Sequence, residues 1–356
     1  MIIVRPEAYR QYPAGRNRFT LVLEQRFADH VRIEPPNRYE TWDTVTAEPG
    51  RSLTDLLRSG VPRDGDVLVV ARDDRLLTAP DPEVGPHRTV AVLRAGTGPL
   101  ALDQLGKLLT ALEKTDPGAL DRAGTALGDA VAAAGGLVLE ETLTGSVAEV
   151  AFTAPTWSRS DTGAFRPGVV QSAPTGMRRL DLAGAGTSVT GQVAAKGWSV
   201  VRTRESDTGA CRQLFEKLSG LFHYPLVLTV EDGAVTDMKA AEAGSATAAA
   251  ALARLFTADA GHARVTGLEF GLNPAAPPLP FNCESNAVAT GRAAVSVHLV
   301  LGAPPLTAFQ VVLDCATSFL TAPGGTAALA GAGTAFATRA PRRRTNRAAA
   351  ADCGCH

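Results

Sequence analysis

Aromatic side chains are scarce in this chain of 356 residues, because phenylalanine, tyrosine and tryptophan together make up only 5% of it. Hydrophobic residues still reach 45%, so we expect cores built mostly of alanine, valine and leucine. The 35 glycines and 23 prolines predict frequent turns. A chain of this length exceeds one small domain and predicts two.

An excess of charge is also absent, since the formal net charge is −1 and the pI is about 6.6. Nucleic acids and anionic membrane surfaces require a basic patch or stripe, so we expect neither as a partner. Runs of ~18 apolar residues, which a membrane span needs, do not occur. The opening MIIVRPEAYRQYPAGR lacks the layout of a signal peptide.

Cysteine is present in an odd and scattered set, which argues against a disulfide framework and for a reducing cytoplasm. The set is Cys211, Cys283, Cys315, Cys353 and Cys355. Cys211 stands where a helix is expected to begin, and a helix N-terminus lowers a thiol pKa. A buried, unreactive thiol is the commoner outcome for such a residue, and we expect it here.

Strands and helices alternate over residues 1–150. RFTLVLEQRF and VRIEPPNRY predict two strands, and DVLVVA and TVAVLRAG predict two more. Ser52 is a candidate N-cap of a short helix, while ALDQLGKLLTALEK and ALDRAGTALGDAVAAA predict longer ones. This alternation is typical of a small α/β domain.

The pattern changes over residues 151–323, where short segments rich in Thr, Val and Gly predict many strands and few helices. TVEDGAVTDM predicts a β-hairpin that turns at Asp232-Gly233. We therefore expect an α+β domain with a mixed or antiparallel sheet. Residues 324–356 consist mostly of Ala, Gly, Thr and Arg, a composition that predicts a disordered tail.

Three stretches occur in an order that resembles one known family. They are PLVLTVEDGAVTDM, ARVTGLEFGLNPAA and SVHLVLG. The order is similar to that of the thermophilic-type leucyl aminopeptidases, metallopeptidases whose relatives include the iron-dependent 2,5-dihydroxypyridine dioxygenase. The resemblance covers residues 170 to 320, and it implies an aminopeptidase-like fold and a homodimer.

The family's two-metal site of glutamates and histidines is mostly missing from the matching positions. The resemblance places family ligands at Met177, Gly267, His298, Ala308 and Gln310, and of these side chains only the histidine binds metals readily. Glu269 lies two residues beyond the family position, roughly 7 Å along a strand. We therefore expect no metal and no other cofactor.

One way of rebuilding a metal site stays open. Glu269, Glu284 and Asp314 are candidate ligands for a mononuclear site around His298. Glu149, in AEVAFTAP, matches a family glutamate locally but lies too far upstream of TSVTGQV to correspond to it. A catalytic zinc usually takes three protein ligands, more than His298 and Glu149 would provide.

A chain that keeps a family's fold but has lost its metal ligands is expected to have a binding role. We expect a catalytically inactive, aminopeptidase-like protein that binds a precursor peptide in ribosomal peptide natural-product biosynthesis, with modifying enzymes as further partners. The resemblance places the peptide at Met177, Arg178, Arg179, Glu269, His298 and Gln310. A guanidinium binds a carboxylate through two hydrogen bonds, which suits Arg178 and Arg179 to a peptide carboxylate.

Two enzymatic alternatives remain at this point. One is a metal-dependent aminopeptidase or oxygenase with a rebuilt site. The other is a metal-free peptide cyclase in which His298 works with Glu269 or Glu284 by acid-base catalysis.

The terminal Cys353, Cys355 and His356 are soft ligands suited to zinc or copper(I), although an end without function is the simpler interpretation.

Overall fold

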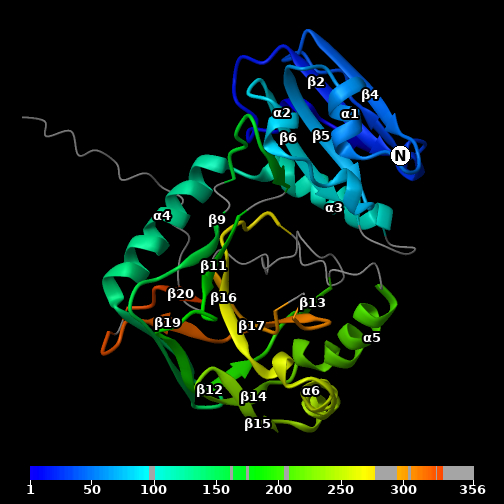
Figure 1. The fold of residues 1–356 in the computed structure, drawn as a ribbon. Coiled ribbons are helices and arrows are strands. Elements are labelled where there is room, and N and C mark those ends of the chain that lie inside the picture. The colour runs from blue at the N-terminus through cyan, green and yellow to red at the C-terminus, as the bar shows by residue number, and fades with distance from the viewer. Residues whose placement is uncertain are drawn as a thin grey trace, which may run out of the picture.

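The computed structural model describes residues 1–95, 101–160, 163–173, 176–203, 208–276, 295–303, 306–325 and 327–331. Three larger sheets organise this part of the chain (Figure 1). The sheet near the N-terminus is parallel, and the other two are antiparallel. The predicted fold class, an α/β unit followed by an antiparallel α+β unit, is confirmed.

The parallel sheet has the strand order β10-β6-β5-β2-β4. Its strands are β2 (Arg18–Glu24), β4 (Thr41–Ala47), β5 (Gly65–Ala71), β6 (Arg88–Arg94) and β10 (Val170–Ser172). The sequence predicts β2, β5 and β6 but not β4 or β10. The apolar runs of β5 and β6 are buried on both faces, as the inner strands of a parallel sheet require.

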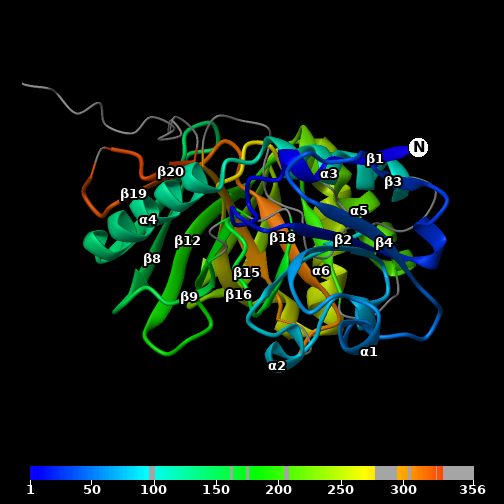
Figure 2. The ribbon, with the colours of Figure 1, turned by 90° about the horizontal axis from the view of Figure 1, so that it is seen from above.

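Helices cover both faces of this sheet (Figures 1 and 2). Leucines of α1 (Leu53–Ser59) and the valine of α2 (Asp81–Val84) pack on one face, and leucines of α3 (Ala101–Lys114) pack on the other. A two-stranded sheet of β1 (Ile2–Val4) and β3 (Val31–Ile33) lies beside α3.

Two local predictions are confirmed in detail. The Ser52 hydroxyl accepts a hydrogen bond from the amide of Asp55, whose carboxylate accepts one from the amide of Ser52, and this capping box starts α1. β14 (Leu226–Glu231) and β15 (Ala234–Ala240) form the predicted hairpin. Asp232 and Gly233 turn it with φ of 49° and 71°, values that suit a type I′ turn.

The remaining strands form two antiparallel sheets. The six-stranded sheet has the order β13-β18-β17-β16-β11-β9, and the seven-stranded sheet has the order β15-β14-β12-β8-β7-β19-β20. The first contains β9 (Trp157–Ser160), β11 (Met177–Asp181), β13 (Val200–Arg202), β16 (Val265–Gly271), β17 (Ser296–Leu301) and β18 (Gln310–Asp314). Besides the hairpin of β14 and β15, the second contains β7 (Gly136–Glu141), β8 (Ser146–Phe152), β12 (Thr187–Ala195), β19 (Phe319–Thr321) and β20 (Ala330–Gly331).

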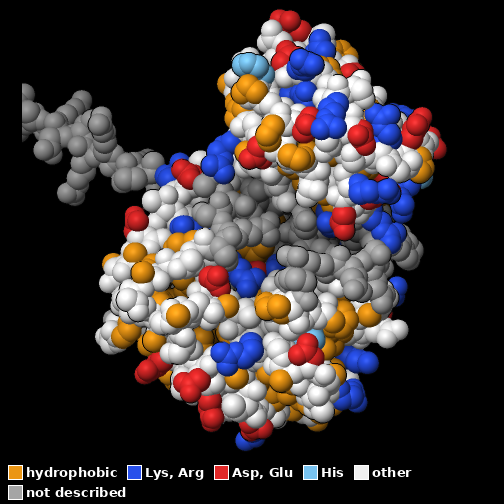
Figure 3. Space-filling model, in the orientation of Figure 1, with side chains coloured by type: hydrophobic (Ala, Val, Ile, Leu, Met, Phe, Trp, Pro, Cys, Tyr) orange, Lys and Arg blue, Asp and Glu red, His pale blue; other side chains and the backbone are white. Residues whose placement is uncertain are grey.

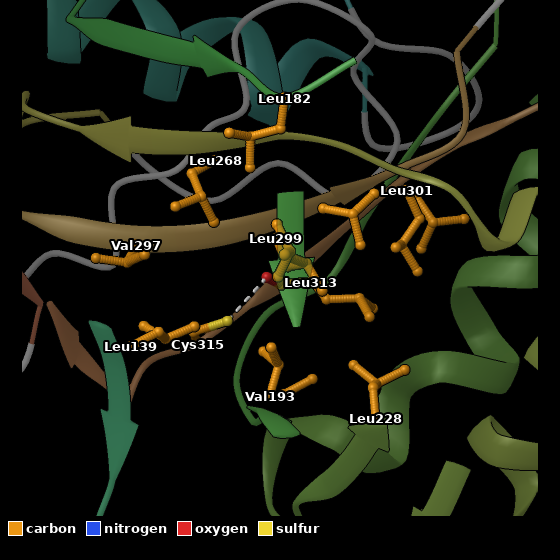
Figure 4. Close-up of a cluster of buried hydrophobic side chains, with 14 of the residues drawn as sticks. Leu139, Leu182, Val193, Leu228, Leu268, Val297, Leu299, Leu301, Leu313 and Cys315 are labelled. Carbon is orange, nitrogen blue, oxygen red and sulfur yellow. Dashed lines mark hydrogen bonds between the residues drawn. The ribbon is translucent and has the colours of Figure 1, made fainter. Parts of the chain in front are cut away.

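One large apolar core lies between these two sheets (Figure 4). Side chains of α4 (Pro117–Ala134), α5 (Thr208–Leu218) and α6 (Ala246–Ala258) complete it. Cys211 lies in this core, in agreement with the prediction of a buried thiol. Among the helices described, none is long and apolar enough to cross a membrane.

Sheet membership crosses residue 150 in both directions. β7 and most of β8 precede this position but belong to the seven-stranded sheet, whereas β10 follows it but extends the parallel sheet. The division into residues 1–150 and 151–323 therefore stays a prediction, and residues 332–356 of the predicted tail lie outside the described residues.

On the face shown in Figure 3, acidic and basic side chains are interspersed.

Candidate functional site

Four neighbouring strands of the six-stranded sheet bring charged and polar side chains into one line. Glu269 of β16 pairs with His298 of β17, which pairs in turn with Asp314 of β18. On the other side, Arg179 of β11 pairs with Glu269. Directly paired residues point to the same face of a sheet, so these four residues form a row, here called the polar row.

The polar row lies on the face opposite to the apolar core. Successive side chains of a strand alternate between faces, and the residues next to the row, such as Leu268, Phe270 and Leu299, belong to the core. Glu269, His298 and Asp314 are each 2% exposed or less. Buried charges are costly unless they are paired, so their contacts determine what this face can do.

Glu269 is held by a buried arginine at the end of β13. The Arg202 Nη1 atom is 2.6 Å from Oε1 of Glu269, and Nη2 is 2.9 Å from Oε2. Both carboxylate oxygens therefore accept hydrogen bonds from one guanidinium, in the two-pronged geometry that arginine forms best. Arg179 adds a second positive charge, with its Nη1 atom 3.8 Å from Oε1 of Glu269.

Arg202 also joins two other predicted site residues. Its Nη1 atom is 3.0 Å from Oε1 of Gln310, the residue paired with it on β18, and its Nη2 atom is 3.9 Å from the sulfur of Met177. The structure thus gathers Met177, Glu269 and Gln310 around Arg202, which is not among the residues predicted from the sequence. Alternation with the core residue Val201 signals that Arg202 faces away from the core, but its partners lie on distant strands.

Asp314 is fixed beside His298. The Asp314 Oδ1 atom is 3.8 Å from Nδ1 of His298, and Oδ2 accepts a hydrogen bond of 3.0 Å from the amide of Trp198. That hydrogen bond requires the chain to pass close to the carboxylate at Gly197, which has a φ of 135°. Any Cβ atom at Gly197 would collide with the Asp314 carboxylate, so glycine is needed here.

The polar row contains donor types that zinc and iron accept, namely carboxylate and imidazole. Their arrangement does not fit a metal ion, because the Arg202 guanidinium lies against both oxygens of Glu269. Over the part of the chain that the structure describes, no three His, Cys, Asp or Glu residues are placed to hold one. Glu284, the other candidate ligand, lies outside the described residues.

Arg178 points to the opposite face of β11 and does not join the other predicted residues. Its guanidinium stacks over the ring of Trp157 at 4.2 Å and donates a hydrogen bond to the carbonyl of Gly124 in α4. Burial lowers the pKa of Arg178, and the nearby Asp129 acts against this shift. These residues line a surface pocket of about 410 Å³ beside α4.

No family model and no curated protein matches this chain. Among solved structures, the chain is similar to 2,5-dihydroxypyridine dioxygenase from Pseudomonas putida KT2440. The two share 13% sequence identity with a TM-score of 0.48, over 91% of this chain and 93% of that chain.

Proposed function

We propose that this chain binds a peptide on the face that carries the polar row, without a catalytic metal ion. The observation that carries the proposal is the buried ion pair between Arg202 and Glu269. A carboxylate that accepts hydrogen bonds from a guanidinium at both oxygens has little capacity left for a metal ion. Such a site is suited to binding rather than to activating a metal-bound water.

Two side chains at the rim of the site suit the recognition of a peptide. Arg179 is 17% exposed and can donate hydrogen bonds, and the half-buried Gln310 can both donate and accept. Backbone amides and carbonyls, together with a terminal or side-chain carboxylate, are the groups by which an extended peptide is held. The proposed ligand is a ribosomal precursor peptide, a choice that rests on the sequence resemblance.

Binding assays with arrayed peptides, followed by isothermal titration of the best one, test this proposal. We expect Arg179→Ala and Gln310→Ala each to weaken binding roughly tenfold or more, equivalent to ~1.4 kcal/mol. Arg178→Ala reports on the opposite face of β11 and should leave the affinity unchanged, as should the exposed control Thr236→Ala on β15. A loss confined to Arg178→Ala would move the binding site to the pocket beside α4 and overturn the proposal.

The contact between His298 and Asp314 favours a second candidate function, a metal-free enzyme that uses acid-base catalysis. A neighbouring carboxylate orients an imidazole and stabilises its protonated form. If the chain cyclises its peptide, an amine of the peptide attacks a backbone carbonyl, the C–N bond of that amide breaks and the C-terminal segment leaves as an amine, so mass spectrometry detects a cyclic product that lacks this segment. This function requires the mass change to disappear in His298→Ala while peptide binding persists, and an unchanged peptide mass argues for binding alone.

Metal analysis separates both functions from a rebuilt metalloenzyme. After incubation with Zn²⁺ or Fe²⁺ and desalting, we expect less than ~0.1 equivalent of metal per chain. A full-length variant with Cys353→Ser and Cys355→Ser controls for capture by the C-terminal thiols. Binding of about one equivalent that is lost in His298→Ala would show that the polar row does hold a metal and would overturn the proposal.

A further inference from the structure

The pocket beside α4 is a second concave surface with charged side chains, and none of its lining residues belongs to the polar row. Its volume is about 410 Å³, and residues of α4, together with Pro155, Trp157 and Arg178, line it. Arg178 and Arg179 are neighbours on β11 and point to opposite faces of the sheet. A pocket of this size accommodates a small molecule.

Small residues of α4 make room for the guanidinium of Arg178 at the wall of this pocket. Gly124 and Gly128 lie one helical turn apart and therefore on the same face of α4. A Cβ atom at Gly128 would lie 2.5 Å from Nη1 of Arg178, and one at Gly124 would lie 3.4 Å from its Cδ atom. The ring of Trp157 lies 4.2 Å from the guanidinium carbon. The Arg178 side chain is thus held in one position by α4 and by Trp157.

The positive charge of Arg178 has no carboxylate in contact with it among the described residues. Its hydrogen bond goes to the carbonyl of Gly124, and its buried Nε atom has no hydrogen-bond partner. Arg202, by comparison, donates to both oxygens of Glu269. A half-buried guanidinium without an anionic partner is stabilised by an anion that enters the pocket.

Two carboxylates line the same pocket. Asp121 and Asp129 are exposed on α4, ~12 Å apart along the helix axis, and Gly124 and Gly128 lie between them. Neither aspartate forms an ion pair with another described residue. One guanidinium and two carboxylates give the pocket an excess of one negative charge. A ligand that complements it carries one carboxylate and two ammonium groups.

We propose that this pocket binds a free amino acid with a basic side chain, such as lysine. The α-carboxylate of the ligand accepts hydrogen bonds from Arg178, and its two ammonium groups donate to Asp121 and Asp129. Trp157 and Pro155 provide apolar surface for the methylene groups of its side chain. Because this site and the polar row share no side chain, the inference does not rest on the proposed peptide binding.

Isothermal titration of the full chain with single amino acids tests the class of ligand. We expect saturable binding of lysine with a Kd of about 1 mM or lower, weaker binding of alanine and the weakest binding of glutamate, which adds a negative charge. Lysine amide lacks the carboxylate and should bind at least about tenfold more weakly than lysine. The proposal is overturned if lysine does not bind saturably, if the three amino acids bind equally, or if lysine amide binds as tightly as lysine.

Substitutions in the pocket test which side chains hold the ligand. Arg178→Ala should weaken lysine binding at least about tenfold. Asp121→Asn/Asp129→Asn changes only exposed side chains and should abolish the preference for lysine over alanine. The control Asp237→Asn, on the exposed part of β15, should leave both affinities unchanged. Lysine binding that persists in Arg178→Ala, or a preference for lysine that persists in the double variant, refutes the assignment.

Two further variants separate this site from the polar row. Gly128→Ala keeps every charge but places a methyl group where Nη1 of Arg178 lies, so it should also weaken lysine binding. Arg179→Ala, which is expected to weaken peptide binding, should leave the affinity for lysine unchanged. Loss of lysine binding in Arg179→Ala but not in Arg178→Ala would place lysine on the polar row and overturn the inference.

Discussion

Replacing Arg202 by methionine would remove the guanidinium that accompanies the buried carboxylate of Glu269. The two hydrogen bonds of 2.6 and 2.9 Å would be lost, while Arg179 would remain with its Nη1 atom 3.8 Å from the carboxylate. Breaking a buried ion pair by removing one partner costs about 3–5 kcal/mol, since the other charge stays buried. We expect about 3 kcal/mol, the lower end, because Arg179 still compensates part of the charge.

The double variant Arg202→Met/Glu269→Leu separates the pair from the packing of each residue. Replacing a buried ion pair by apolar residues of similar volume is often neutral or stabilising. We therefore expect the double variant to be more stable than Arg202→Met alone, with a coupling energy of about 2 kcal/mol. Because both charges leave together, the double variant buries no unmatched carboxylate.

Urea unfolding followed by circular dichroism, together with calorimetry, measures these changes. With an unfolding entropy of ~2.1 cal/mol/K per residue over 356 residues, a loss of about 3 kcal/mol corresponds to a fall of roughly 4 °C in the unfolding temperature. Arg58→Met is the matched control, since Arg58 forms a similar pair with Glu83 but its side chain is 59% exposed. Exposed pairs contribute less than ~1 kcal/mol. If Arg202→Met costs no more than Arg58→Met, the argument that Arg202 neutralises Glu269 is refuted.

Two further predictions concern other parts of the chain. Burial raises the pKa of Asp66 to about 6, and the hydrogen bond from Tyr39 opposes this shift. The protonated carboxyl therefore stabilises the fold by about 3 kcal/mol below about pH 4. This contribution is lost as the pH rises through 6. Asp66→Asn should make the urea midpoint less dependent on pH between 4 and 6. A pH dependence equal to that of the native chain would contradict the raised pKa of Asp66. Gly128→Ala should displace Arg178, whose Nη1 atom lies 2.5 Å from a Cβ atom built there. In thermal unfolding, Gly128→Ala should stabilise the protein only in an Arg178→Ala background, by ~1 kcal/mol. The control Gly106→Ala in α3 has open space around it and should stabilise the unmodified chain.

Much of the secondary structure follows from local patterns in the sequence. Apolar runs identify β5 and β6, leucine spacing identifies α3, and Asp232-Gly233 identifies the hairpin. β4 escapes such patterns, because TWDTVTA has little apolar character and its exposed position requires none. Its structure depends on the pairing with β2, which is not visible from the strand itself.

The candidate site follows from the sequence only in part. Alternation within GLEFG and SVHLV places Glu269 and His298 away from the core, which is a local property. Strand order decides that these two residues face each other and that Asp314 follows them. The same alternation separates Arg178 from Arg179, although both stand together in the predicted site.

By itself, the sequence determined the fold class and most of its elements, because each depends on residue types and short-range spacing. Only the tertiary structure decided that Arg202, at the end of β13, pairs with Glu269. These two residues are 67 positions apart in the chain, and no local pattern links them. Their meeting depends on β18 and β17 lying between β13 and β16 in the sheet. The low polarity of that buried face then requires the carboxylate to have a cation beside it.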